Sequence, residues 1–119
     1  MERQRPSEHP RQWIGHLVQV EIDRPIGSRH PRFEALVYPV NYGYVPGTMA
    51  PDGQEIDAYV LGVHRPLDRF EGRCIAVIRR QDDCEDKLVI APDGRDFDDA
   101  EILETVSFQE KYFTAILLR

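Results

Sequence analysis

Short runs rich in valine and isoleucine, separated by clusters of glycine, proline and aspartate, recur along this 119-residue chain. They span residues 56–63, 72–79 and 87–91, and each has the β-branched composition and the turn-forming borders of a strand. The connections between them are too short for the helical crossovers that join successive parallel strands. The pattern therefore favours a small antiparallel β-barrel over a repeated βαβ fold.

The two ends of the chain add an alternating segment and a helix. Apolar and polar residues alternate from Leu17 to Asp23, which predicts a half-buried strand. Asp98, followed three residues later by Glu101, matches a capping box, and apolar residues recur at helical spacing over 101–113. We therefore expect a mainly β fold (β+α) with one C-terminal helix: a small closed antiparallel β-barrel, OB-like, with a closing strand at 115–118.

The domain organisation follows from length and composition. Residues 1–12 are polar and contain two prolines, which we interpret as a flexible N-terminal arm, so that 13–119 form a single domain. No apolar run approaches the roughly 20 residues that cross a bilayer, and the N-terminus lacks the apolar segment of a signal peptide. Cys74 and Cys84 form no CxxC pair, which favours a reducing compartment. We expect a cytoplasmic protein with no membrane partner.

The formal net charge of −6 bears on the possible partners. Binding to a nucleic acid backbone needs a basic stripe that displaces counterions, so we expect no nucleic acid partner. An acidic chain that handles phosphate needs metal ions between itself and its substrate.

An acidic segment at 50–57 contains Asp52, Glu55 and Asp57 and leads into one of the expected strands. Strand alternation sends Asp57 and Tyr59 to the same face. Hard divalent cations bind to such clusters of carboxylate oxygens. The alternative interpretation is a solvated acidic turn, because Asp-Gly is a strong turn dipeptide.

Two more segments carry groups that suit phosphate chemistry. Residues 81–87 hold Asp82, Asp83, Glu85, Asp86 and Lys87 between two apolar runs, where the alternative is a charged hairpin tip. Residues 38–46 hold three tyrosines among prolines and a glycine. Tyrosine hydroxyls can donate to phosphate oxygens, and aromatic packing at a barrel end is the alternative.

Taken together and in this order, these segments resemble the soluble (family I) inorganic pyrophosphatases. The resemblance covers residues 18–113. It rests on these motifs: Asp23-Arg24-Pro25, Gly27-Ser28, Arg32-Phe33-Glu34, Tyr38 to Gly43, the signature-like Asp52 to Asp57, and the acidic segment that ends at Lys87.

Roles for individual residues are implied by this resemblance. It implies that the protein binds Mg²⁺ or Mn²⁺. The implied metal ligands are Asp52, Asp57, one of Asp82 and Asp83, one of Glu85 and Asp86, and Asp23. Glu21 is the alternative to Asp23. It implies substrate binding by Arg32, Tyr38, Tyr42, Lys87 and Tyr112. It implies catalytic roles for Asp57, Lys87, Tyr42 and Glu34.

Three departures from the family pattern are visible. Gln54 replaces the middle aspartate of the signature, which in the family helps to activate the attacking water. Tyr112 is followed by Phe113 where the family has a lysine, so a phosphate-binding cation is missing unless Lys111 substitutes. Only three residues separate Glu34 from Tyr38, which leaves no room for a hairpin strand that supplies another arginine.

The resemblance implies metal-dependent hydrolysis of inorganic diphosphate, a phosphoanhydride, to phosphate by a metal-activated water. One alternative is a hydrolase of a nucleotide or another diphosphate substrate. A second is a non-catalytic module that binds metal and phosphate. The family also forms oligomers, which makes a homo-oligomer an expectation for this chain.

Overall fold

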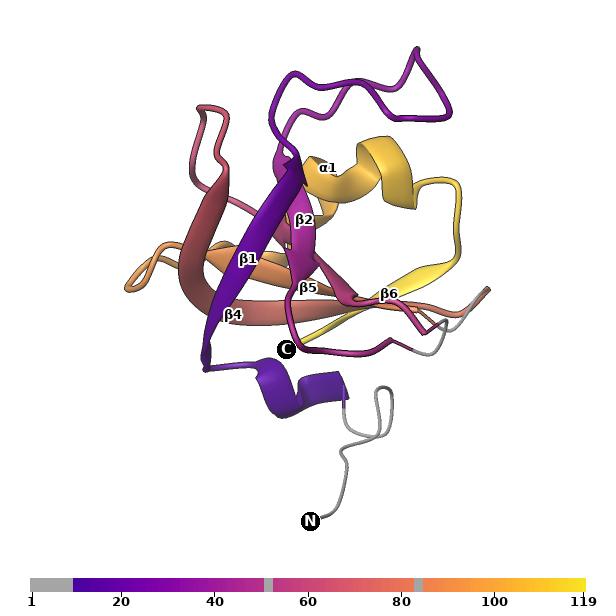
Figure 1. Ribbon diagram of the computed structural model, residues 1–119. Coiled ribbons are helices and arrows are strands. Elements are labelled where there is room, and N and C mark those ends of the chain that lie inside the picture. The colour runs from indigo at the N-terminus through magenta and orange to yellow at the C-terminus, as the bar shows by residue number, and fades with distance from the viewer. Residues whose placement is uncertain (1–9, 51–52, 83–84) are drawn as a thin grey trace.

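The structure is a computed structural model that describes residues 10–50, 53–82 and 85–119. Residues 1–9 of the expected arm lie outside the described residues. Figure 1 shows the elements, which are a short 3-10 helix (Pro10–Trp13), β1 (Leu17–Arg24), β2 (Asn41–Val45), β3 (Ile56–Val60), β4 (Arg69–Arg80), β5 (Asp86–Ala91), α1 (Asp99–Glu110) and β6 (Ala115–Leu118). No helix of the described part is long and apolar enough to cross a bilayer.

The strands form one sheet in the order β1-β2-β3-β5-β4-β6, and a further pairing of β1 with β4 closes β1 to β5 into a barrel. The expected closed barrel with one helix is confirmed. The β3–β5 pairing is parallel, whereas the other strand pairings in the described part are antiparallel. This pairing is parallel because β4 crosses the barrel and β5 returns antiparallel to β4, in the direction of β3.

β4 closes the barrel because it is long and bent, as Figure 1 shows. Its first residues pair with β1 and the rest pair with β5, with a register shift between Cys74 and Ala76. Gly72 lies where β4 passes from one partner to the other. A Cβ atom there would come within 2.7 Å of the Ile90 side chain, so the close approach of β5 requires glycine.

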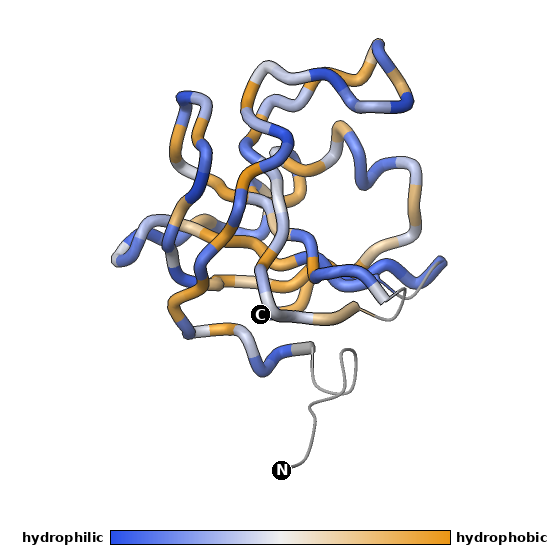
Figure 2. Tube along the Cα trace, in the orientation of Figure 1, coloured by the Kyte–Doolittle hydropathy of each residue, from blue (hydrophilic) through white to orange (hydrophobic). Residues whose placement is uncertain are grey.

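Two hydrophobic cores lie on the two sides of the barrel wall. Along β3, Ile56, Ala58 and Val60 belong to one core, and Tyr59 belongs to the other, which also contains residues of α1. Figure 2 shows hydrophobic and hydrophilic positions alternating along β1, whereas β6 is hydrophobic throughout. Because side chains alternate along a strand, Asp57 shares the helix side of the wall with Tyr59.

The helix begins where the sequence predicts and ends earlier. Asp98 accepts a hydrogen bond from the Glu101 backbone N–H, and the Glu101 side chain accepts one from the Asp98 N–H, so the capping box is confirmed. The helix ends at Glu110 with Lys111 as C-cap. Phe113 was expected in the helix, and this was wrong: its backbone N–H bonds to the Glu110 carbonyl in a turn that leads into β6.

Asn41 fixes the loops beside the barrel, and it is completely buried. Its side-chain oxygen accepts hydrogen bonds from the backbone of Ile26 and Leu67, and its side-chain nitrogen donates to the carbonyls of Val63 and Arg65. One amide therefore ties together the segments that follow β1 and β3. This satisfies backbone groups that would be costly to bury without partners.

Candidate active site

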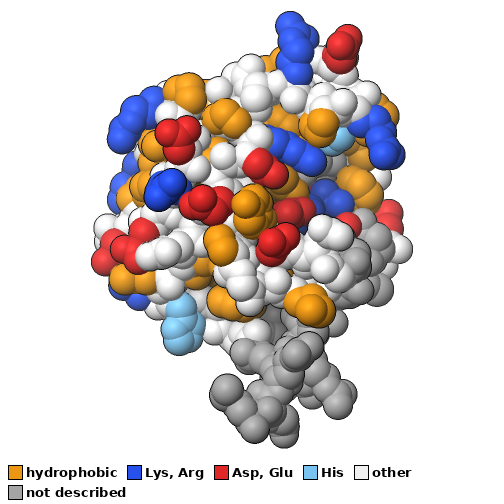
Figure 3. Space-filling model, in the orientation of Figure 1, with side chains coloured by type: hydrophobic (Ala, Val, Ile, Leu, Met, Phe, Trp, Pro, Cys, Tyr) orange, Lys and Arg blue, Asp and Glu red, His pale blue; other side chains and the backbone are white. Residues whose placement is uncertain are grey.

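A pocket of about 690 Å³ opens on the helix side of the barrel wall. Its polar lining residues are Arg24, His30, Tyr42, Asp57, Arg80, Glu85, Lys87, Gln109 and Tyr112, and its apolar ones are Phe33, Ala35, Leu36 and Phe113. On the face seen in Figure 3, acidic, basic and hydrophobic side chains are interspersed and form no continuous basic stripe. The pocket thus offers cations, carboxylates and hydroxyls to one ligand.

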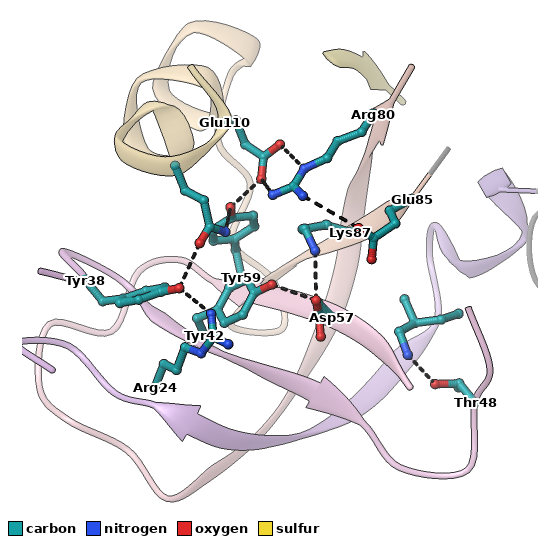
Figure 4. A network of polar contacts seen from close by, with 12 residues as sticks. Arg24, Tyr38, Tyr42, Thr48, Asp57, Tyr59, Arg80, Glu85, Lys87 and Glu110 are labelled. Atoms are coloured by element: carbon teal, nitrogen blue, oxygen red, sulfur yellow. Dashed lines mark hydrogen bonds and ion pairs between the residues drawn. The ribbon is translucent and has the colours of Figure 1, made fainter. Parts of the chain in front are cut away.

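Asp57 is the point at which the polar groups of the pocket converge, as Figure 4 shows. Its Oδ2 accepts hydrogen bonds from the Tyr42 hydroxyl at 2.7 Å and from Lys87 Nζ at 2.8 Å. Strand pairing explains the convergence, because Tyr42 pairs with Tyr59 on β2–β3 and Lys87 pairs with Asp57 on β3–β5. The side chain of Asp57 is 34% exposed whereas that of Lys87 is 3% exposed, so the carboxylate is the part that a ligand can reach.

Tyr42 stays protonated in this arrangement. Burial raises the pKa of Tyr42 well above its ordinary value, and the neighbouring charge of Asp57 raises it further. Its hydroxyl is therefore a permanent donor near neutral pH. Its ring also lies against cations, since Lys87 Nζ is 5.7 Å and the Arg24 guanidinium carbon 5.4 Å from the ring centroid.

A second network of hydrogen bonds runs beneath the pocket from β1 to β4 through α1 (Figure 4). Each bond in it lies between 2.6 and 2.8 Å. In order, its side chains are Arg24, Tyr38, Gln109, Tyr59, Glu110 and Arg80. Every hydroxyl and amide in the series donates in one direction, toward Glu110, so the network has one consistent set of proton positions.

The Glu110 end of this network is a buried ion pair. Arg80 Nε and Nη2 donate to the two oxygens of Glu110, both at 2.8 Å. Burial raises the pKa of Glu110, but hydrogen bonds from Arg80 and Tyr59 lower it by more, and the net shift is downward. The Arg80 guanidinium also stacks 3.7 Å from the centroid of the Phe113 ring and lies 3.7 Å from Glu85. The pair fixes the end of α1 against β4.

The loop that follows β1 forms one wall of the pocket through His30, Phe33 and Leu36. His30 Nδ1 accepts hydrogen bonds from the backbone N–H groups of Arg32 and Phe33, which fixes the turn. Burial and the positive charges of Arg24 and Arg32 lower the pKa of His30. A neutral His30 with Nδ1 as acceptor is therefore the form present near pH 7.

Several residues predicted from the sequence do meet in this pocket. They are Tyr42, Asp57, Glu85, Lys87 and Tyr112. Between the alternatives Glu85 and Asp86, the structure brings Glu85 to the pocket, while Asp86 forms an ion pair with Arg79 at 3.0 Å. Adjacent residues of a strand point to opposite sides, so Asp86 and Lys87 cannot both face the pocket.

Other predicted residues lie elsewhere. Tyr38 is completely buried below the pocket floor. Asp82 is exposed and accepts a hydrogen bond from the Thr114 backbone N–H at 2.8 Å. Asp23, Arg32 and Glu34 are exposed and do not line the pocket. Asp52 and Asp83 lie outside the described residues.

The carboxylates near the pocket bear on the expected metal. Within residues 10–50, 53–82 and 85–119, no three carboxylate, histidine or cysteine side chains gather as a metal cage. Asp57 and Glu85 both line the pocket, and their hard oxygen donors suit Mg²⁺ or Mn²⁺. The chemistry of these two described donors therefore fits such an ion.

Four polar residues that line the pocket were not predicted from the sequence: Arg24, His30, Arg80 and Gln109. Arg24 lies inside the Asp23-Arg24-Pro25 motif, but the resemblance to the family implied a role only for Asp23. Arg80 and Gln109 gave no local signal, because strand pairing and the position of α1 bring them to the pocket. A search for cations at strand ends next to the tyrosine-rich segment would have found Arg24.

Comparison with known proteins identifies relatives that are all inorganic pyrophosphatases. The family model described as inorganic pyrophosphatase matches residues 15–116. An inorganic pyrophosphatase of Saccharolobus solfataricus is 36% identical over 75 residues, which are 60% of this chain and 40% of that protein. One of Neisseria meningitidis is 33% identical over 93 residues, which are 72% of this chain and 48% of that protein. The chain spans less than half the length of these two curated relatives.

The fold of this chain is similar to that of solved structures. The crystal structure of an inorganic pyrophosphatase from Ehrlichia chaffeensis superposes with a TM-score of 0.65 at 20% sequence identity. The superposition covers 86% of this chain and 84% of that one. At this level of identity the likeness supports the barrel fold.

Proposed function

The chain belongs to the inorganic pyrophosphatase family, and from that premise we propose that it hydrolyses inorganic diphosphate to two phosphates. The observation that carries the proposal is the pair of donors on Asp57. Tyr42 and Lys87 both donate to Oδ2 of a carboxylate that lines a pocket large enough for diphosphate and ions. A carboxylate, a cation and a hydroxyl donor in one pocket are the groups that this reaction requires.

The reaction transfers a phosphoryl group to water. A water oxygen loses one proton and forms a bond to one phosphorus, the bond from that phosphorus to the bridging oxygen breaks, and the proton passes to the leaving phosphate or to solvent. Negative charge grows on the leaving phosphate, and Lys87 offsets it, while Tyr42 keeps its single O–H on Asp57 and holds that carboxylate in place. Tyr112, 66% exposed at the pocket mouth, adds a second hydroxyl on the solvent side.

Mg²⁺ or Mn²⁺ is the cofactor that we propose for this site. Asp57 and Glu85 would hold it, together with Asp52 and Asp82 or Asp83 as the resemblance implies. When bound, the ion supplies a water acidic enough to attack near neutral pH. Asp57 then has two tasks, since the same carboxylate also holds Lys87 Nζ, whose other N–H donors remain for the substrate.

Arg32 and Glu34 take part in this proposal only through movement of their loop. They are exposed next to Phe33 and Ala35, which line the pocket. Closure of the loop over bound diphosphate would bring both side chains to the substrate. Catalytic loops commonly close in this way.

The test is phosphate release from inorganic diphosphate, measured with and without Mg²⁺ or Mn²⁺. We expect metal-dependent release by the wild type, and for Asp57→Asn a loss of about a hundredfold or more, because a metal ligand and the partner of Lys87 are lost together. Asp93→Asn is the matched control, since Asp93 is exposed and pairs with Arg73 away from the pocket.

Two results contradict the proposal. One is the absence of phosphate release with either metal, and the other is an Asp57→Asn variant as active as the wild type. A parallel assay with nucleoside diphosphates tests the identity of the substrate. Faster phosphate release from a nucleoside diphosphate than from inorganic diphosphate would show that the nucleotide is the better substrate.

A further inference from the structure

Among the residues that the structure describes, three basic side chains besides His30 line the pocket, and they differ in their ion-pair partners. Lys87 forms an ion pair with Asp57 at 2.8 Å, and Arg80 forms one with Glu110 at 2.8 Å. Arg24 also lines the pocket, but within the described residues it forms no ion pair with a carboxylate. Arg24 is therefore the lining cation whose charge remains available to an anionic ligand.

A β-bulge brings Arg24 to this position. The register between β1 and β2 shifts between Ile22 and Arg24, so that Asp23 is left out of the pairing and Arg24 lies opposite Tyr42. Bulges commonly redirect side chains next to functional sites. Here the arginine, and not the neighbouring acid, reaches the pocket.

The side chain of Arg24 is held in place by tyrosines. Nη1 donates to the Tyr38 hydroxyl at 2.6 Å, and the guanidinium carbon lies 5.6 Å from the Tyr38 ring centroid and 5.4 Å from that of Tyr42. The Tyr38 hydroxyl itself donates to Gln109 at 2.7 Å, so its oxygen is left to accept from Arg24. A guanidinium has five N–H donors, and this arrangement uses one of them.

We propose that Arg24 binds a phosphoryl group of the ligand in this pocket and that Tyr38 positions it. The proposal deepens the proposed function and rests on it for the identity of the ligand as diphosphate or phosphate. A planar guanidinium presents parallel N–H donors that match two phosphate oxygens. Tyr38 is completely buried and does not line the pocket, so it acts through Arg24.

The experiment compares Arg24→Gln, Arg24→Lys and Tyr38→Phe with the control Arg69→Gln. Arg69 has a side chain that is 79% exposed and it does not line the pocket. Phosphate binding is measured by calorimetry with Mg²⁺ present, and KM and kcat for diphosphate are measured separately. Circular dichroism and thermal unfolding verify that each variant is folded.

For Arg24→Gln we expect about a ten- to hundredfold weaker affinity for phosphate and a corresponding rise in KM, the effect of one lost charge-assisted contact. Arg24→Lys keeps the charge and recovers part of the affinity. Tyr38→Phe weakens binding less, and adding it to Arg24→Gln causes little further loss, because both changes act through one side chain.

Wild-type phosphate affinity in a folded Arg24→Gln variant overturns the inference, and so does an equal loss in Arg69→Gln. Because binding is measured without turnover, the two proposals fail separately. If the wild type binds phosphate through Arg24 but does not hydrolyse diphosphate, the inference stands and the proposed function fails. If Arg24→Gln hydrolyses diphosphate as well as the wild type does, the proposed function stands and the inference about Arg24 fails.

Discussion

Lys87 donates to Asp57 Oδ2 at 2.8 Å, and the two residues are register partners across the parallel β3–β5 pairing. The geometry of the barrel thus fixes this contact, and no flexible loop intervenes. Lys87 is almost fully buried while the Asp57 carboxylate is partly exposed. Both residues line the pocket, and the carboxylate is the more accessible of the two.

Lys87→Gln should lower kcat for diphosphate by about ten- to a hundredfold while leaving Mg²⁺ affinity unchanged or higher. The variant loses a cation that offsets developing charge, but it also removes a positive charge that repels a metal ion at Asp57. Calorimetry with Mg²⁺ and steady-state kinetics separate the two effects. A parallel fall in Mg²⁺ affinity and kcat would show that Lys87 supports the metal site instead.

Gln54→Asp should raise diphosphatase activity by about tenfold. Gln54 is exposed near the start of β3, where a carboxylate would add a negative charge and a group that can take a proton from water. Gln54→Asn serves as the control, because it changes side-chain length without adding charge. Equal rates in all three proteins would mean that residue 54 does not limit the reaction.

Glu110→Gln should reduce the free energy of unfolding by about 3 kcal/mol at pH 7, because the buried Arg80 loses the carboxylate that binds it bidentately and keeps the longer contact with Glu85. The pKa of Glu110 lies below its ordinary value of 4.5. Its contribution is therefore complete above pH 4.5 and is lost as the pH falls through the lower, folded-state pKa. The gap between wild type and variant should narrow in acid.

Urea unfolding at several pH values measures this gap. Glu104→Gln is the control, since Glu104 is exposed on the same helix. A constant gap from pH 7 into the acid range would mean that ionisation of Glu110 is not what stabilises the pair.

Gly43→Ala should destabilise the barrel by about 3 kcal/mol or more. A Cβ atom at this position would overlap the Glu21 carbonyl oxygen and lie 2.8 Å from Ile22 Cα, and backbone atoms cannot move aside as side chains do. Gly94→Ala is the comparison, because its φ of +88° strains alanine but nothing lies within 4 Å. Its expected loss is roughly 1–2 kcal/mol. Equal losses in urea unfolding would contradict this explanation.

The parts of the fold that local signals determine were predictable. The alternation in β1 and the capping box at Asp98 depend on neighbouring residues, and both were confirmed. The strand β2 was missed, because it contains tyrosine, asparagine and glycine in place of β-branched alternation and is buried on both faces. The parallel β3–β5 pairing depends on how β4 closes the barrel, which no local pattern carries.

The same distinction applies to the site. Asp57, Lys87 and Tyr42 were predicted because they match motifs of the inorganic pyrophosphatase family, and the structure brings them together. Arg24 and Arg80 were not predicted, because their roles arise from a bulge and from contact with a helix far along the chain. Pairing across distant segments decides which charges line a pocket.

The hydrogen-bond network beneath the pocket imposes an order on folding during synthesis. Tyr38 must wait for Gln109, 71 positions later, and Tyr59 for Glu110, 51 positions later. Until that segment leaves the ribosome, Tyr38 and Tyr59 lack the hydrogen-bond partners on α1 that they have in the folded protein. The hydrogen bonds beneath the pocket are therefore complete only after α1 has been synthesised and has packed against the barrel.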